Sequence, residues 1–250
     1  MLQLPEISAS LSESLQLAQT PVAVTFCDAL PEGVSMWSGS VPAGCRFWQE
    51  AATKTFATTA RQHDLCAIGV HTHNLEGTAA TNADLGDALE VFAGLSYVRA
   101  DDVAQIPVLA KRSKYVVYGP LASIPVAPDV VLLFVQADQT LILCEAAQQI
   151  EGGAPLAMGR PACAVIPQTA NTGRSALSLG CCGARAYLEV MTENVALFAI
   201  PGSRLAEYSE RVAALAKANA ILTQFHGIRR RDIEAGKTPT VKESLALMSA

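Results

Sequence analysis

Apolar runs broken by polar and glycine-rich stretches predict alternating strands and helices along the first half of the chain. The run PVAVTFCD from Pro21 is rich in β-branched residues and predicts a buried strand, which follows helical spacing over residues 11–17. Apolar residues over 45–60 recur at helical spacing, so we expect Cys45 near a helix start. Residues 84–98 read as an amphipathic helix that opens on an acidic residue.

The second half continues this alternation, but without a regular period. The expected strands cover residues 114–118, 130–136, 162–166, 175–179 and 195–200. The expected helices cover residues 138–150, a segment after Cys182, and residues 203–222. The tail from Gly227, which holds three consecutive arginines, is expected to fold over the surface.

This irregular order favours a mixed α/β (α+β) fold, with central strands and helices packed around them, over a regular doubly wound sheet. With 250 residues, half of them hydrophobic, the chain is expected to form a single compact domain over 1–250. The glycine-rich stretch EGGAPLAMGRP puts a candidate lobe boundary near 151–160. Both halves pair a strand with a Gly-Cys helix start, which leaves open two related lobes facing one site.

Charge and composition narrow the class of partner. The net charge of −5 and the pI near 5.4 provide no basic face for nucleic acid or for an anionic membrane. The N-terminus lacks a basic start followed by an apolar run, and residues 115–135 are interrupted by glycine and proline, so we expect neither an export signal nor a membrane span. Seven cysteines without an export signal indicate a reducing, cytoplasmic environment.

Four of the cysteines carry the most pointed chemistry. Cys45, Cys66, Cys163 and Cys181 lie beside glycine, proline or charged residues at element boundaries, whereas Cys27 and Cys144 fit the core. No C-x-x-C pair is present, so the fold must bring four separate loops together, as in iron–sulfur enzymes more than in zinc fingers. Cys182 adjoins Cys181, and we interpret it as a neighbour because adjacent side chains diverge.

Basic side chains near these cysteines are candidates for handling substrate or protons. His63, His71 and His73 cluster around Cys66, and on a strand the last two would share a face. Arg46 and Arg185 each stand close to a cysteine and could stabilise an anionic cluster or bind an anionic substrate. The alternatives are hydrogen-bonded histidines in a polar loop and arginines exposed to solvent.

The same segments resemble a known family. PAGCRFW, H-x-x-C-x-x-G with a following H-x-H, YGPL, PDVVLLFV, RPACAVIPQ, SLGC and ALFAIPGSRL together are similar to the family called domain of unknown function 169. The resemblance implies that Cys45, Cys66, Cys163 and Cys181 are the recurring cysteines. Gln62 and Leu65 depart from the family pattern around His63. The family name brings a fold and a cofactor expectation and no reaction.

We therefore expect an iron–sulfur protein with a [4Fe–4S] cluster on the four cysteines, acting as a redox enzyme or electron-transfer component on a small polar or anionic molecule. A redox partner protein and an oligomer are left open. One alternative is a hydratase or lyase that uses an open cluster iron. Others are a four-thiolate zinc site and a metal-free small-molecule binding protein.

Overall fold

The structure, a computed structural model, describes residues 3–246 and confirms the α+β class. Its strands are β1 (Val22–Cys27), β2 (Phe56–Thr58), β3 (Tyr115–Pro120), β4 (Val130–Val135), β5 (Leu156–Met158), β6 (Ala176–Ser178) and β7 (Ala196–Pro201). They form one sheet in the order β2-β3-β1-β4-β7-β6-β5. Neighbouring strands are antiparallel except for the parallel pair β5 and β6. Strands before and after residues 151–160 thus belong to the same sheet.

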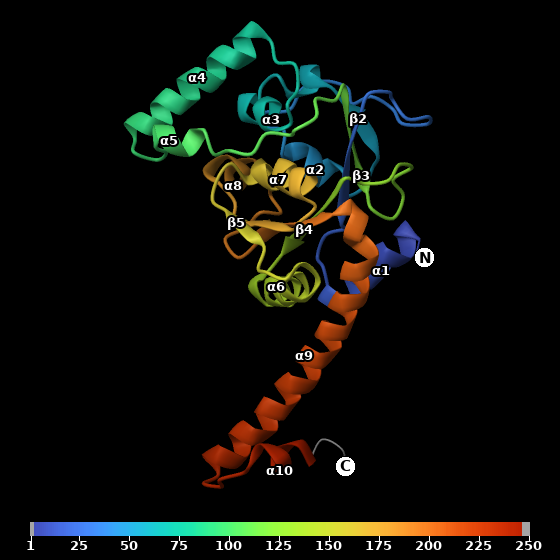
Figure 1. Cartoon of the computed structure of the whole chain (residues 1–250), viewed down its shortest axis with the longest axis vertical. Helices are drawn as coiled ribbons and strands as arrows, with labels where there is room; N and C mark the ends of the chain where they lie inside the picture. Colours follow the sequence, from blue (N-terminus) through green and yellow to red (C-terminus); the bar gives the residue numbers. More distant parts are fainter. Residues whose placement is uncertain (1–2, 247–250) are drawn as a thin grey trace.

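Helices cover both faces of this sheet, and two helical segments project from it (Figure 1). The helices are α1 (Leu4–Leu15), α2 (Arg46–Glu50), α3 (Ala67–Thr72), α4 (Ala79–Gly94), α5 (Ala100–Val103), α6 (Ala137–Glu151), α7 (Val165–Thr172), α8 (Cys182–Tyr187), α9 (Leu205–Glu234) and α10 (Val241–Ala246). Short 3-10 turns add η1 (Ala60–His63), η2 (Ala162–Ala164) and η3 (Gly202–Arg204).

Alternation along the strands divides the core into two layers. On β4, Val130, Leu132 and Phe134 face one layer and the intervening Val131, Leu133 and Val135 face the other, because successive strand side chains point to opposite faces. The second layer is completed by α1, α6 and α9. The first is completed by α2, α3, α7 and α8, and this is the layer that contains Cys163.

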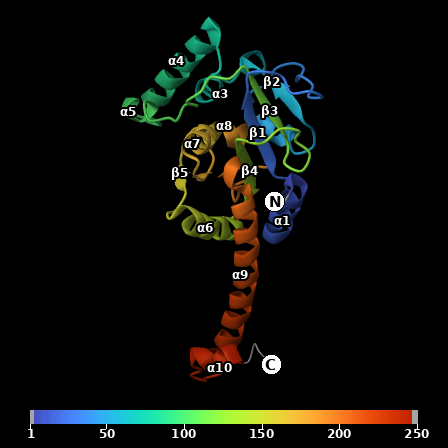
Figure 2. The ribbon, with the colours of Figure 1, turned by 45° about the vertical axis from the view of Figure 1, so that its right-hand side comes forward.

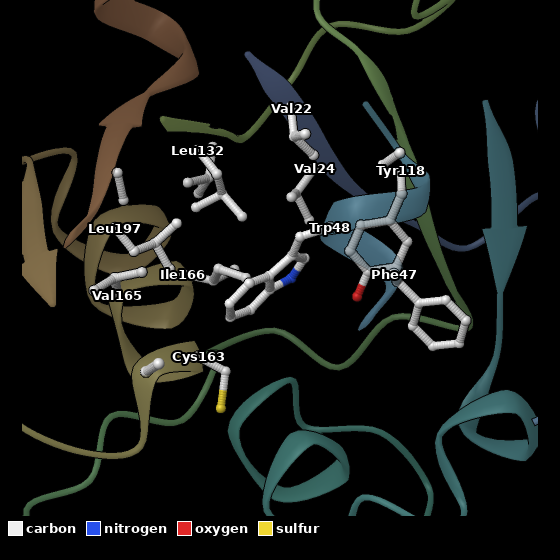
Figure 3. Packing of buried hydrophobic residues seen from close by; sticks show 14 of the residues in the cluster. Val22, Val24, Phe47, Trp48, Tyr118, Leu132, Cys163, Val165, Ile166 and Leu197 are labelled. Atoms are coloured by element: carbon white, nitrogen blue, oxygen red, sulfur yellow. The ribbon is translucent and has the colours of Figure 1, made fainter. Parts of the chain in front are cut away.

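Large aromatic side chains build the floor of the first layer (Figure 3). Phe47 and Trp48 of α2 are fully buried and lie against Tyr118 of β3, with the Phe47 and Tyr118 rings stacked at 5.6 Å. Cys163 adjoins this layer beside Val165 of α7. This aromatic floor is thus built jointly by α2 and β3.

Two sequence predictions in this layer are wrong. Residues 162–166, expected as a strand, form η2 and the start of α7. A short apolar run buried on all sides does not distinguish a strand from a buried helix, since both lack a polar face. The helix expected over 45–60 ends at Glu50, and β2 follows it as an edge strand, because the Thr-rich stretch after Ala52 favours extended backbone.

The two projecting segments lie at opposite ends of the molecule (Figure 2). One is the α4–α5 hairpin, which contacts the body through α3. The other is the distal part of α9 with α10 packed on it. The prediction that the arginine tail folds over the surface is therefore wrong, because the tail continues a helix that leads away from the body. Within residues 3–246, no helix combines the length and apolar character that crossing a membrane requires.

Candidate functional site

Three of the four cysteines singled out by the sequence occupy the residue directly before a short helix. Cys45 precedes α2, Cys66 precedes α3 and Cys181 precedes α8. The first N–H groups of a helix have no acceptor within it and are free to bond a neighbouring group. The Cys181 Sγ accepts one such bond from the Ala184 amide at 3.4 Å. Each of these thiols is thus placed beside backbone donors.

Cys163 is held in a different way, inside the turn η2. Its side chain is buried, and its Sγ accepts a hydrogen bond from the Thr72 hydroxyl at 3.4 Å. Thr72 lies at the end of α3, the helix that Cys66 precedes. This bond therefore joins the segments of two candidate cysteines that are far apart in the sequence.

All four cysteines line a single cavity of about 970 Å³. Its size lies at the upper end of the range of ligand pockets, about 300–1,000 Å³. The charges of Cys66, Cys181 and Cys45 contribute to the raised pKa of Cys163, so these sulfurs are within electrostatic reach of Cys163. Yet among the described side chains no group of three or more His, Cys, Asp or Glu residues is placed to hold a metal ion. The sulfurs share a cavity without converging on one point.

Burial keeps the thiols of Cys45, Cys66 and Cys163 protonated in the absence of a metal. Burial, with smaller contributions from the charges of Cys66 and Cys181, raises the pKa of Cys45 to about 12. It also raises the pKa of Cys66 and, well above the usual value, that of Cys163. Hydrogen bonding from the backbone of Gly44 and Gly69 opposes this effect at Cys66. A bound metal would reverse the balance, because metal-bound thiols are deprotonated.

Two glycines leave the space around Cys66 open. A Cβ at position 69 would lie 2.9 Å from the Cys66 Sγ, closer than ordinary side-chain contacts allow. A Cβ at position 44 would lie 2.8 Å from the His63 Nδ1 and 3.6 Å from the same sulfur. Any larger residue at either position would fill the region that the Cys66 sulfur faces.

His63 and His73 are both buried and lie next to each other, with ring centroids 5.8 Å apart. Burial lowers the pKa of His73 to about 4 and that of His63 well below its usual value, so both rings are neutral. The His73 Nδ1 lies 2.8 Å from the Gly69 carbonyl oxygen. Because a carbonyl oxygen can only accept a hydrogen bond, we assign the ring proton to Nδ1. The His73 Nε2 is then an unprotonated nitrogen without a partner among the described residues, and His73 lines the cavity.

Tyr118 is the functional candidate that the sequence reasoning missed. Its hydroxyl is buried without a hydrogen-bond partner among the described residues. Burial first, and then the charges of Cys66, Cys163 and Cys45, raise the Tyr118 pKa well above its usual value. The hydroxyl is thus an unused donor within electrostatic reach of three of the thiols. Its segment, YGPL, was one of the family-like motifs, but a tyrosine within a strand pattern reads as ordinary core.

Arg46, Arg185 and His71 lie outside the cavity lining, whereas Cys182 is part of it. Arg46 pairs with Glu50 and Glu189 and donates to the Tyr187 carbonyl, so it ties α2 to the end of α8. Arg185 donates to four backbone carbonyls, those of Leu179, Met191, Thr192 and Val195. His71 is half-buried within α3, where helical geometry turns it away from His73. Cys182 is exposed at the cavity rim.

One comparison with known proteins identifies a family. The profile of domain of unknown function 169, described as uncharacterised ArCR, matches residues 10–211. Comparisons with curated proteins and with solved structures gave no match. The matched region contains all four candidate cysteines and ends within the first turns of α9. On this match over most of its length, the chain belongs to the domain of unknown function 169 family.

Proposed function

We propose that this protein binds a [4Fe–4S] cluster through Cys45, Cys66, Cys163 and Cys181 and uses it to exchange electrons with a small molecule in the adjoining cavity. The observation that carries the proposal is that four cysteines, from four separate segments, line one cavity. Four cysteine thiolates are the usual ligand set of such clusters.

A cluster makes a less strict demand on the positions of the thiols than the zinc alternative does. A structural zinc ion needs four ligands around one point, with each Zn–S distance about 2.3 Å. The described side chains form no group gathered that tightly. A cluster has one iron at each of four corners, so its ligands stand further apart around a larger body.

The surroundings of the cavity suit an anionic cluster. Gly44 and Gly69 leave room beside the Cys66 sulfur. The Tyr118 hydroxyl is an available donor near three of the thiols. Hydrogen bonds to cluster or ligand sulfurs raise the reduction potential. We therefore expect Tyr118 to tune the potential, a role the sequence had suggested for Arg46 and Arg185.

When bound, the cluster would supply one-electron transfer. The chain itself would release protons from the thiols on loading, and the unprotonated His73 Nε2 would be available as a hydrogen-bond acceptor beside the cavity. Electron transfer is preferred over hydro-lyase chemistry because four cysteines occupy all four irons and leave no open coordination site.

We also propose a reducing cytoplasm as the working compartment. All seven cysteines lie within the described residues and none of them forms a disulfide. Oxidising compartments favour paired cysteines, whereas thiols that serve as ligands persist where glutathione and thioredoxin keep them reduced.

Serine substitution tests the ligand set. Protein purified without oxygen should be brown with broad visible absorption, and Cys45→Ser should lose this absorption because one thiolate ligand is removed. Cys27→Ser should keep it, since Cys27 lies on β1 outside the cavity lining. An unchanged spectrum in Cys45→Ser would remove that residue from the ligand set. A colourless protein that contains zinc would support the zinc alternative.

A further inference from the structure

We propose that the cavity beside the cysteines binds a mainly hydrophobic molecule that carries one anionic group, with its apolar part along α4 and its anion at Arg160. This inference deepens the proposed function, on which it rests for the ligand's role as the redox substrate. The sequence had suggested a small polar or anionic substrate. The lining of the cavity is instead largely apolar outside the cysteines.

The apolar wall comes from one face of α4. Leu85, Ala88, Leu89 and Phe92 all line the cavity, and their spacing of three and four residues puts them on one side of the helix. Thr81 is the only residue of α4 that is buried. The apolar face of this helix therefore borders the cavity and is not packed into the core, as such a face normally is.

The opposite wall is also apolar. Leu156 and Met158 of β5 line the cavity, and the Leu156 side chain is 52% exposed despite that position. Leu65, beside Cys66, is 62% exposed on the same cavity. Large aliphatic side chains on both sides of this cavity therefore remain in contact with water. An apolar ligand would cover them and remove that contact.

One cation is available for an anionic group. Among the described residues that line the cavity, Arg160 is the only lysine or arginine. Its guanidinium lies over the Tyr97 ring, 4.0 Å from the centroid, which holds the group in place. Asp102, also on the lining, interacts with Arg99 instead. Asp84 also lines the cavity, one turn before Ala88 on α4. Because its carboxylate would repel an anion, we place the anionic group of the ligand at Arg160 and away from Asp84.

The occupant is a small molecule and not a protein segment, because the walls come from five separate stretches of chain that enclose a pocket of ligand size with the cysteines on it. Such an occupant would bring its apolar part next to the proposed cluster. Electron transfer between the two would then need no large movement of the body.

A fluorescent polyunsaturated fatty acid, cis-parinaric acid, is a suitable probe for titration of the anaerobically purified full chain. We expect saturable binding, weakened about tenfold by Leu89→Gln, which puts an amide on the cavity face. Val91→Gln is the matched control, since Val91 is 57% exposed and lies off the lining. Equal affinities in the two variants, or no saturable binding to the wild type, would overturn the proposal.

The anion is tested separately with Arg160→Gln and the methyl ester of the same probe. The variant should bind the acid about tenfold more weakly and the ester unchanged, because only the acid loses a charged partner. Acetate should not compete with the acid. If acetate displaces it, or if Arg160→Gln affects acid and ester alike, the cavity does not recognise an apolar anion.

Iron and sulfide measured in the same samples separate this inference from the cluster proposal. Iron-loaded protein that fails to bind the probe would disprove the ligand class and leave the cluster standing. Probe binding with the expected variant effects in protein without iron or sulfide would disprove the cluster and leave an apolar binding pocket.

Discussion

Burial controls the charge of three thiols and one imidazole on the cavity lining, those of Cys45, Cys66, Cys163 and His73. Cys163, His63 and His73 are all buried, and burial pushes each toward its neutral form. An iron-free site of neutral thiols and imidazoles is compatible with an apolar core. Loading with an anionic cluster would then depend on the donors that face it, of which Tyr118 is the clearest.

This burial predicts a pH dependence for the iron-free chain. The pKa of His73 falls from 6.5 in the unfolded chain to about 4 in the folded one. Between these values the unfolded chain takes up a proton that the folded chain refuses. The contribution of His73 to the unfolding free energy is therefore fully present above pH 6.5 and is lost as the pH falls toward 4. The shift corresponds to about 3 kcal/mol, and His63 acts in the same direction.

Urea unfolding at several pH values measures this dependence. His73→Gln should flatten the fall in unfolding free energy over the same window. His226→Gln, at an exposed position on α9, should keep the wild-type slope. A His73→Gln slope equal to that of the wild type would show that His73 is not neutral and buried in the fold.

Sequence reasoning at the residue scale depends on local context. Glycine and charged neighbours set Cys45, Cys66, Cys163 and Cys181 apart from Cys27, and these four line the cavity together with Cys182. It could not separate His71 from His73, since that choice depends on whether the segment is helical. It also could not find Tyr118 or Arg160, whose roles arise from packing between segments distant in the chain.

Among the elements, the turn from β7 into α9 has the least room for change. A Cβ at Gly202 would lie 1.7 Å from the Pro128 carbonyl oxygen. The Gly202 amide also donates to the Asp129 carbonyl at 2.9 Å. This contact joins the turn to the start of β4, so the two central strands are fixed where α9 leaves the sheet.

Alanine at this turn should therefore destabilise the whole fold. We expect Gly202→Ala to lower the unfolding free energy by about 3 kcal/mol, because backbone must move to admit the methyl group. Gly86→Ala is the matched control on α4, where an added Cβ meets nothing within 4 Å. That control should raise stability by up to about 1 kcal/mol. Equal effects of the two substitutions in chemical denaturation would contradict the described turn.

Runs rich in β-branched residues predicted β1, β3, β4 and β7 close to their observed bounds, and the short apolar alternation at 175–179 predicted β6. The apolar run at 162–166 failed because nothing in its local pattern records that both sides are buried. The edge strand β2 was missed because its residues continue the apolar spacing that predicted a helix over 45–60.

On the scale of the whole molecule, the body and the distal arm are separable. The family match ends at residue 211. The buried residues through which α9 contacts α1 and α6 end at Val212. The one buried residue further along α9 is Phe225, which lies near α10. Residues 217–224 are exposed on every side of the helix. The arm beyond them therefore contributes little to the stability of the sheet and the cavity.

Truncation tests this division. A chain that stops after Lys217 should unfold within about 2 °C of the full chain, because it keeps Leu205, Tyr208 and Val212 in the core. A chain that stops after Arg204 should fail to fold, since it also loses the Tyr208 hydroxyl bond to the Glu151 side chain. Loss of folding in the longer truncation product would show that the arm is part of the core.

Iron and acid-labile sulfide analysis of the full chain, purified without oxygen, tests the central claim most directly. The account predicts about four iron and about four sulfide per chain, with both lost in Cys163→Ala, which removes the most buried of the proposed ligands. A chain that carries neither iron nor sulfide under these conditions, or one that carries a single zinc ion, would contradict it.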